Sequence, residues 1–127
     1  MIGLHFMLDG VVREPVTREL IDFILHELPG RIGMEILVGP VVVAGNSTNP
    51  GWTGFVVIDK SHIAIHTFTE GSRVSIDVYS CQPFDVNEVE KFLKSEIALT
   101  RVKKRTISRS EAQLECGFQT LRGEPTE

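Results

Sequence analysis

Apolar residues near the amino terminus form two patterns that predict a strand followed by a helix. Residues 2–8 are a short apolar run that the turn-forming pair Asp9-Gly10 brings to an end, which is typical of a strand. From residue 17 to residue 28, apolar side chains recur at spacings of three and four, as on one face of a helix. Pro29-Gly30 then predicts the end of that helix.

The next part of the chain is rich in β-branched residues and predicts further strands. Residues 34–43 read as a strand interrupted by Gly39-Pro40, so we expect a bulge or an edge position there. Residues 45–51 are turn formers throughout and predict a surface loop. The apolar residues 52–58 predict a buried strand.

Alternation of polar and apolar residues predicts a hairpin in the centre of the chain. Residues 61–68 place His62 and His66 on one face, and Ile63 and Ile65 on the other. Residues 74–79 alternate in the same way, so the intervening turn joins two antiparallel strands.

A second helix and a basic strand region complete the pattern. Asp85 followed by Glu88 forms a capping pair for a helix over residues 86–97, whose apolar positions have helical spacing. Residues 99–118 mix β-branched and basic residues and predict one or two further strands.

This order of elements predicts one α+β domain over residues 1–127. We expect a two-layer sandwich in which an antiparallel sheet carries both helices on one face. The other face of the sheet then needs a cover. A second copy of the chain would supply one, so we expect a homodimer.

Composition narrows the class of protein further. With 42% apolar and 24% charged residues, the chain has the composition of a folded globular protein. Its formal charge of -4 disfavours nucleic acid or an anionic membrane as partner, and the basic residues 101–109 read as a solvated strand face or a protected edge. No apolar run approaches the roughly 18 residues of a membrane-spanning helix. Cys81 and Cys116, without a secretory leader, indicate reduced thiols in the cytoplasm.

Reactive side chains gather in and around the predicted hairpin. His62 and His66 would lie roughly 13 Å apart along a strand, too far to share a metal ion, so no metal site is predicted. Ser61 with a histidine and Asp77 would form a hydrolase triad, but the Gly-x-Ser-x-Gly pattern of a nucleophile elbow is absent. Cys81 with His66 as nucleophile and base is a third possibility, which the sequence leaves open.

Three motifs together carry a family resemblance. Residues 61–70 read Ser-His-Ile-Ala-Ile-His-Thr-Phe-Thr-Glu, residues 75–81 read Ser-Ile-Asp-Val-Tyr-Ser-Cys, and residues 3–6 read Gly-Leu-His-Phe. They resemble the short prokaryotic S-adenosylmethionine decarboxylases. The family pattern is approximately Glu-Ser-His-x-x-Ile-His-Thr-Trp-Pro-Glu, then Ala-x-Asp-x-x-Thr-Cys, after a Gly-x-His-Leu start.

The resemblance implies a proenzyme that cuts itself between Lys60 and Ser61 into fragments 1–60 and 61–127. The Ser61 hydroxyl would attack the Lys60 carbonyl, and the resulting ester would eliminate and hydrolyse to leave a pyruvoyl group derived from Ser61. That group forms a Schiff base with a substrate amine and acts as electron sink for decarboxylation, so no bound coenzyme is needed. The product would be the aminopropyl donor for polyamine synthesis.

The resemblance also implies roles for five further residues or positions. His66 would assist self-processing, and Cys81 would protonate the decarboxylated α-carbon. Thr53 stands where the family has a serine that helps processing. Phe68 replaces the tryptophan of the adenine platform, and Glu70 matches the glutamate expected to hold the ribose hydroxyls of S-adenosylmethionine.

Departures from the family pattern favour two alternatives. Lys60 replaces the glutamate before the cleaved bond, and residues 45–50 lack the His-Arg-Phe element that helps to sandwich the adenine. The first alternative is a pyruvoyl-dependent decarboxylase of arginine or ornithine. The second is an unprocessed homologue with a binding or regulatory role.

Overall fold

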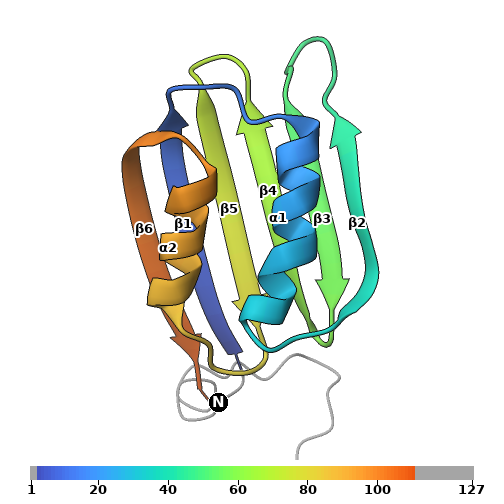
Figure 1. Ribbon diagram of the computed structural model, residues 1–127, viewed down its shortest axis with the longest axis vertical. Coiled ribbons are helices and arrows are strands. Elements are labelled where there is room, and N and C mark those ends of the chain that lie inside the picture. Colours follow the sequence, from blue (N-terminus) through green and yellow to red (C-terminus); the bar gives the residue numbers. More distant parts are fainter. Residues whose placement is uncertain (1–2, 111–127) are drawn as a thin grey trace, which may run out of the picture.

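Six strands form one antiparallel sheet, and two helices pack on the same face of it (Figure 1). The computed structural model describes residues 3–110. The strands are β1 (Gly3–Val12), β2 (Ile36–Ala44), β3 (Trp52–Ile58), β4 (Ser61–Phe68), β5 (Arg73–Ser80) and β6 (Leu99–Arg109). The helices are α1 (Arg18–Arg31) and α2 (Val86–Glu96). The strand order is β2-β3-β4-β5-β1-β6, and every neighbouring pair is antiparallel, so the predicted two-layer α+β sandwich is confirmed.

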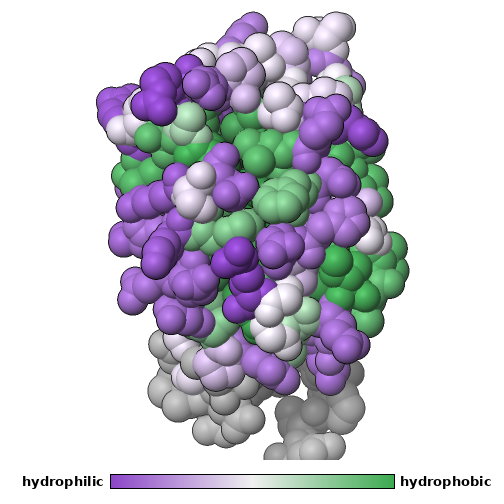
Figure 2. Space-filling view, in the orientation of Figure 1, coloured by the Kyte–Doolittle hydropathy of each residue, from purple (hydrophilic) through white to green (hydrophobic). Residues whose placement is uncertain are grey.

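Strand alternation decides which side chains meet the helices. On β4, Ile63 and Ile65 are fully buried, whereas His62 and His66 point to the opposite side and are partly exposed. Four apolar residues of α1 are fully buried in the same core: Ile21, Ile24, Leu25 and Leu28. Burial of each such side chain contributes about 1.5–3 kcal/mol, so the apolar stripe of α1 holds the helix on the sheet. Figure 2 shows that the solvent side of this helix layer is largely hydrophilic, with smaller hydrophobic areas.

The opposite side of the sheet, which we call the outer face, carries no helix of residues 3–110 (Figure 1). The cross-strand register places two rows of side chains on it. One row is Thr53, His66, Ser75, Asp9 and Lys103, and another is Val57, His62, Tyr79, His5 and Ile107. Toward the β2 edge the outer face exposes apolar side chains, namely Val38, Val41, Val43 and Phe55. This face is therefore mixed in character, with its apolar part at one edge.

Both helices begin at the side-chain caps that their sequences provide. The N–H of Leu20 donates to Thr17 Oγ1 at 3.1 Å at the start of α1. Asp85 accepts the N–H groups of Asn87 and Glu88 at the start of α2, as predicted.

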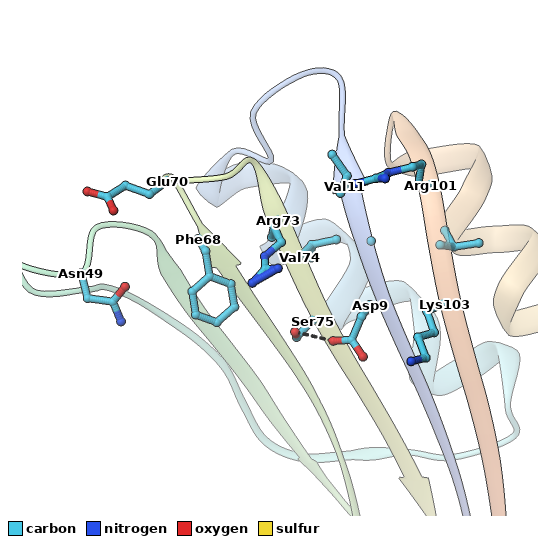
Figure 3. Close-up of a pocket in the computed structure, with 12 residues that line it drawn as sticks. Asp9, Val11, Asn49, Phe68, Glu70, Arg73, Val74, Ser75, Arg101 and Lys103 are labelled. Atoms are coloured by element: carbon cyan, nitrogen blue, oxygen red, sulfur yellow. Dashed lines mark hydrogen bonds between the residues drawn. The ribbon is translucent and has the colours of Figure 1, made fainter.

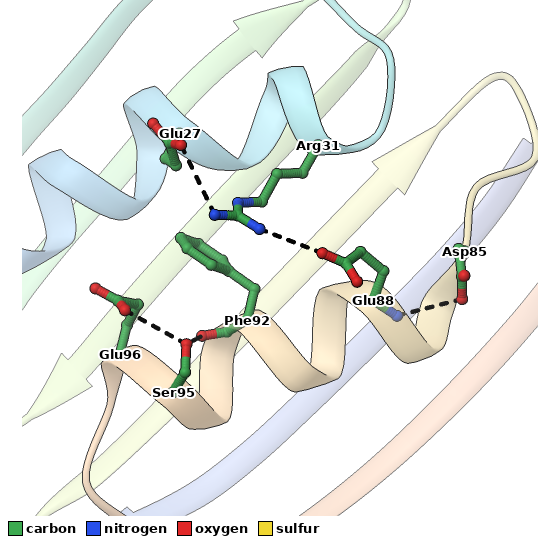
Figure 4. A network of polar contacts seen from close by, with 7 residues as sticks. All are labelled: Glu27, Arg31, Asp85, Glu88, Phe92, Ser95 and Glu96. Carbon is green, nitrogen blue, oxygen red and sulfur yellow. Dashed lines mark hydrogen bonds and ion pairs between the residues drawn. The ribbon is translucent and has the colours of Figure 1, made fainter.

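The spacing of Asp85 and Glu88 suggests that the Glu88 carboxylate caps the start of α2, but this carboxylate forms an ion pair with α1 instead. It binds the Arg31 guanidinium of α1 at 3.2 Å, and that guanidinium also lies 4.3 Å from the centre of the Phe92 ring (Figure 4). Arg31 additionally pairs with Glu27 at 3.8 Å. The pair of helices is thus joined by an ion-pair and cation–π contact on the solvent side.

Two predicted element ends are wrong. β1 continues through Asp9-Gly10 to Val12, because both residues pair with β5 on one side and β6 on the other. A Cβ atom on Gly10 would lie only 2.5 Å from a Leu99 methyl group, so the glycine here serves close packing and not a turn. α1 continues through Pro29-Gly30 to Arg31, so both residues belong to its last turn, and Pro29 is buried in the core.

The remaining strand predictions agree with the structure where it describes them. β2 pairs irregularly with β3 on both sides of Val38, and Gly39 there has a φ of 93°, which confirms the predicted bulge. β6 accounts for residues 99–109 of the region 99–118, and residues 111–118 lie outside the described part of the chain. Within residues 3–110, no helix is long and apolar enough to cross a membrane.

Gly54 offers a test of the packing between α1 and β3. A Cβ atom at Gly54 would lie 2.4 Å from Ile21 Cγ2 and 2.8 Å from Leu25 Cδ1, both in the buried core. We expect Gly54→Val to lower the free energy of unfolding by about 1–3 kcal/mol, because the helix must move outward. Urea unfolding followed by circular dichroism measures this change.

Gly30→Ala is the matched control, because no heavy atom lies within 4 Å of a Cβ at that position and the residue is helical. We expect it to be neutral or stabilising by up to about 1 kcal/mol. Equal destabilisation by both substitutions would contradict the close packing of α1 on Gly54.

Candidate functional site

Ser61 begins β4 directly after the two-residue turn Asp59-Lys60, and its side chain is held by two hydrogen bonds. The hydroxyl donates to the Asp59 carbonyl oxygen at 2.8 Å and accepts the N–H of Cys81 at 2.8 Å. Ser61 is only 7% exposed, whereas Lys60 is exposed. Lys60 has a φ of 51°, in the left-handed region that costs a residue with a side chain about 1–2 kcal/mol. The bond between Lys60 and Ser61 thus follows a strained residue and lies beside a fixed hydroxyl.

Cys81 lies immediately after β5 and contacts the same turn. Its thiol donates to the Asp59 carbonyl oxygen at 3.5 Å, so the Cys81 thiol and the Ser61 hydroxyl share one acceptor. Cys81 is partly exposed and its sulfur is not in a disulfide. The structure therefore brings together two of the sequence-predicted residues, Ser61 and Cys81, at the β3–β4 turn.

His66 and Thr53 form a second group on the outer face. They are directly opposite in the pairing of β3 with β4, and Thr53 Oγ1 lies 3.3 Å from His66 Nδ1. Both line a small cavity of about 290 Å³ together with loop residues, including Asn46 and Asn49. The contact between Thr53 and His66 depends on strand register, which sequence periodicity alone does not provide.

Phe68 and Glu70 lie at the same end of β4 as His66. Both line a larger cavity, of about 840 Å³, that opens on the outer face. The Phe68 ring stands in this cavity, whereas the carboxylate of Glu70 points away from it (Figure 3). Asn49 borders both cavities, so the loop of residues 45–50 forms part of their common wall.

The predicted site residues therefore fall into two groups within one chain. Ser61 and His66 are five positions apart along the extended strand, which corresponds to roughly 16 Å. The first group, Ser61 and Cys81, lies at the β3–β4 turn, and the second, Thr53, His66, Phe68 and Glu70, lies toward the other end of β4. A single chain does not bring the two groups into contact.

This separation excludes two simpler catalytic arrangements within one chain, the thiol–imidazole pair and the Ser-His-Asp triad. Cys81 and His66 do not form a thiol–imidazole pair within one chain, because they belong to different groups. The hydroxyl of Ser61 binds backbone groups, and Asp77 pairs with His5 at 3.2 Å, so no Ser-His-Asp triad is formed among them. Among the described residues, no group of three or more His, Cys, Asp or Glu could hold a metal ion.

Sequence reasoning missed a row of rings on the outer face next to the Ser61 end. His62 stacks on Phe55 with ring centres 5.4 Å apart, and it lies 5.6 Å from Tyr79, which in turn meets the edge of His5 at 6.0 Å. Arg109 lies 5.0 Å from the Tyr79 ring centre. Period-two alternation indicates one face for each strand, but only the register joins four strands into one row.

The environment of His62 favours its neutral form. Burial lowers the pKa of His62, the positive charge of His5 lowers it further, and Arg109 adds a smaller effect in the same direction. Asp77 opposes them by raising the pKa of His62. The net pKa of His62 lies below the ordinary 6.5, so this imidazole is mainly uncharged at neutral pH.

Comparison with known proteins finds one family. A family profile described as S-adenosylmethionine decarboxylase matches residues 12–110. The S-adenosylmethionine decarboxylase proenzyme of Caldanaerobacter subterraneus is 36% identical over 93 residues, covering 68% of this chain and 72% of the relative. The proenzyme of Clostridium botulinum is 32% identical over 62 residues, covering 48% of this chain and 53% of the relative. The matched segment thus spans only about half the length of the Clostridium botulinum relatives.

A solved structure supports the fold. The crystal structure of the adenosylmethionine decarboxylase from Aquifex aeolicus superposes with a TM-score of 0.66, covering 99% of this chain and 98% of that chain. The sequence identity is 22%, so this likeness concerns the arrangement of helices and strands.

The row of rings generates a prediction for His5→Gln. Because His5 lowers the pKa of His62, and because Asp77 raises it, removing the His5 charge should raise the pKa of His62 toward 6.5. NMR titration of the imidazole Cε1–H signals measures the change directly. His26→Gln, on the exposed side of α1, is the control and should leave the His62 titration unchanged. A downward shift of the His62 pKa in His5→Gln would contradict this account of the row.

Proposed function

Because the chain belongs to the S-adenosylmethionine decarboxylase family, we propose that it is a self-processing, pyruvoyl-dependent decarboxylase acting on S-adenosylmethionine. The product would serve as aminopropyl donor in polyamine synthesis. The observation that carries this proposal is the convergence of the Ser61 hydroxyl and the Cys81 thiol on the Asp59-Lys60 turn. Nucleophile and proton donor thus lie beside the one peptide bond whose cleavage the proposal requires.

In the proposed cleavage, Ser61 Oγ forms a bond to the Lys60 carbonyl carbon while the Lys60–Ser61 amide bond breaks, which leaves an ester and a free amine. Loss of the Ser61 α-proton then expels the Lys60 carboxylate, and hydrolysis of the resulting enamine releases ammonia and leaves the pyruvoyl group. The left-handed Lys60 favours the first step, because opening the turn relieves its backbone strain. The chain would end as fragments 1–60 and 61–127.

The residues around Ser61 fit a carbonyl group at that position. The Cys81 N–H donates to Ser61 Oγ, the oxygen that leaves with the Lys60 carboxylate, so this N–H would be free for another acceptor at the processed terminus. The pyruvoyl group supplies an electron sink for the electrons left when carbon dioxide departs. The Cys81 thiol, which contacts the Asp59 carbonyl oxygen of the same turn, would deliver the proton that completes the reaction.

A homodimer would complete the site, and we propose that the outer faces of two chains pack together. Two sheets stacked about a two-fold axis, with β4 of each chain antiparallel to its copy, would bring the Ser61 end of β4 in one chain close to the His66 group of the other. His66, supported by Thr53, would then assist processing in the partner subunit. The exposed apolar residues Val41 and Phe55 on the outer face would be buried by the same contact.

Phe68 and Glu70 are the proposed substrate-binding residues in this arrangement. The Phe68 ring is 37% exposed in the larger cavity and offers a surface for a flat ring such as adenine. Glu70, at the rim, would accept hydrogen bonds from ribose hydroxyls. The nearby loop contributes the amides of Asn46 and Asn49 where the family pattern has an aromatic residue, which favours arginine or ornithine as the alternative substrate.

Single substitutions test the two roles at the turn. We expect Ser61→Ala to remain one full-length chain, because no hydroxyl is present to attack Lys60. Cys81→Ala should be cut, yet release carbon dioxide from carboxyl-labelled S-adenosylmethionine at least about 100-fold more slowly, since the proton donor is gone. Intact mass under denaturing conditions and trapped labelled carbon dioxide are the two measurements.

Cys116→Ala is the control for loss of a thiol and should be cut and active like the unaltered chain. An uncut unaltered protein would overturn self-processing and favour the unprocessed binding homologue. A cut protein that releases carbon dioxide only from labelled arginine or ornithine would retain the chemistry and replace the substrate.

Mixed dimers test whether the site is shared between chains. Cys81→Ala and Glu70→Gln each disable a different group, so a hybrid dimer retains one site with both residues intact. Random pairing of co-expressed variants should restore about one quarter of the native activity, because half of the dimers are hybrids with one intact site each. Activity no higher than the average of the separately purified variants would show that each site lies within one chain.

A further inference from the structure

The larger cavity contains a group of basic side chains that the proposed chemistry does not use. It opens on the outer face between the β4–β5 turn and β6, with a volume of about 840 Å³. Arg73 begins β5, Arg101 and Lys103 lie on β6, and β1 passes between these strands. Three cations from two strands thus border one hollow, in a chain whose formal net charge is -4.

The acidic residues of the cavity leave two of these cations without a partner. Asp9 accepts the Ser75 hydroxyl at 2.6 Å and lies directly opposite Lys103 in the pairing of β1 with β6. Glu70 points away from the hollow (Figure 3). Within residues 3–110, neither Arg73 nor Arg101 forms an ion pair or a side-chain hydrogen bond.

The two guanidinium groups approach the same space from opposite sides. Arg73 and Arg101 are each directly opposite Val11 in the register, so only β1 separates their strands. Figure 3 shows Arg101 extending over Val11 toward β5, and Arg73 turned along its own strand between Phe68 and Ser75. The short Val11 side chain leaves the space above β1 open to both guanidinium groups.

We propose that Arg73 and Arg101 form a binding site for the phosphate or carboxylate group of a small molecule. A guanidinium presents parallel N–H donors that match the oxygens of either anion, and two guanidiniums on opposite sides bind such a group from both directions. The space next to Phe68 would hold the remainder of the ligand. This anion site lies beside the proposed substrate surface but does not depend on self-processing or on decarboxylation.

The size and surroundings of the hollow favour a small molecule. Its volume falls in the usual range for small-molecule sites, roughly 300–1,000 Å³. A nucleic acid backbone would need an extended basic surface, whereas Asp9 lies among the basic residues here. The net charge of the chain also opposes a polyanion.

The test measures binding directly and needs no turnover. Inorganic phosphate is titrated into ¹⁵N-labelled full-length protein at constant ionic strength, and the arginine Nε–H signals and the backbone amide signals around the cavity are followed by NMR. We expect saturable shifts of the Arg73 and Arg101 signals. The double variant Arg73→Gln/Arg101→Gln should weaken binding at least about tenfold, because the charge-assisted hydrogen bonds are lost. A parallel titration with malonate distinguishes the two sources of the anion, since the tighter binder identifies phosphate or carboxylate.

Arg105→Gln is the matched control, because Arg105 lies on the same face of β6 but does not line the cavity. It should bind phosphate and malonate like the unaltered protein. Absence of saturation with both anions would overturn the proposal, and so would equal weakening in the control and the double variant. The backbone amide spectrum of each variant reports whether it is folded. Failure of the proposed decarboxylation would leave these binding results unaffected, so the two proposals fail separately.

Discussion

The register of β4 between β3 and β5 is the constraint on which the rest of the structure depends. Side chains alternate along β4, so a shift by one residue would turn Ile63 and Ile65 to solvent and His66 into the core. The two fully buried isoleucines exclude that shift by the free energy of their burial. The same register sets His66 opposite Thr53 and lets the two-residue turn end at Ser61. Core packing and candidate chemistry are thus fixed by one set of strand pairings.

Because of this register, the candidate reactive residues lie at two separate places along β4 and not in one pocket. Ser61 is held at the β3–β4 turn, and His66 lies roughly 16 Å away on a rigid, fully paired strand, so no side-chain rotation brings them together. In the proposed function, a second surface supplies what each end lacks. The uncovered outer face, with its apolar β2 edge, is the surface from which such a contact would be built. The proposed dimer would therefore bury the exposed apolar residues of the outer face and also bring the two groups of candidate residues together.

Sequence periodicity predicted both helices, the sheet type and the shared face of the helices, because burial imposes the periods on which those inferences depend. It failed where pairing overrides local preference, as at Asp9-Gly10, which two neighbouring strands hold extended. Motif resemblance supplied the residues of both groups but not their separation. The contact of Thr53 with His66, and the cavity that Arg73 and Arg101 both line, join residues distant in sequence and follow only from strand order. Long-range pairing is the information that local patterns lack.

The charge of the larger cavity bears on every substrate considered. S-adenosylmethionine carries a positive sulfonium group, and arginine and ornithine carry cationic side chains. Arg73 and Arg101 beside Phe68 oppose all three, and the acidic surface elsewhere offsets little of this, because charges are screened beyond about 8 Å at physiological ionic strength. An anion held between the two arginines would remove the repulsion. By linkage, a cationic substrate would then strengthen the binding of a small anion, such as phosphate, that leaves the Phe68 surface free for the substrate. The arginine pair therefore makes the affinity for a cationic substrate depend on whether an anion fills the cavity. It affects the affinity for the three substrates in the same direction, so it discriminates little among them.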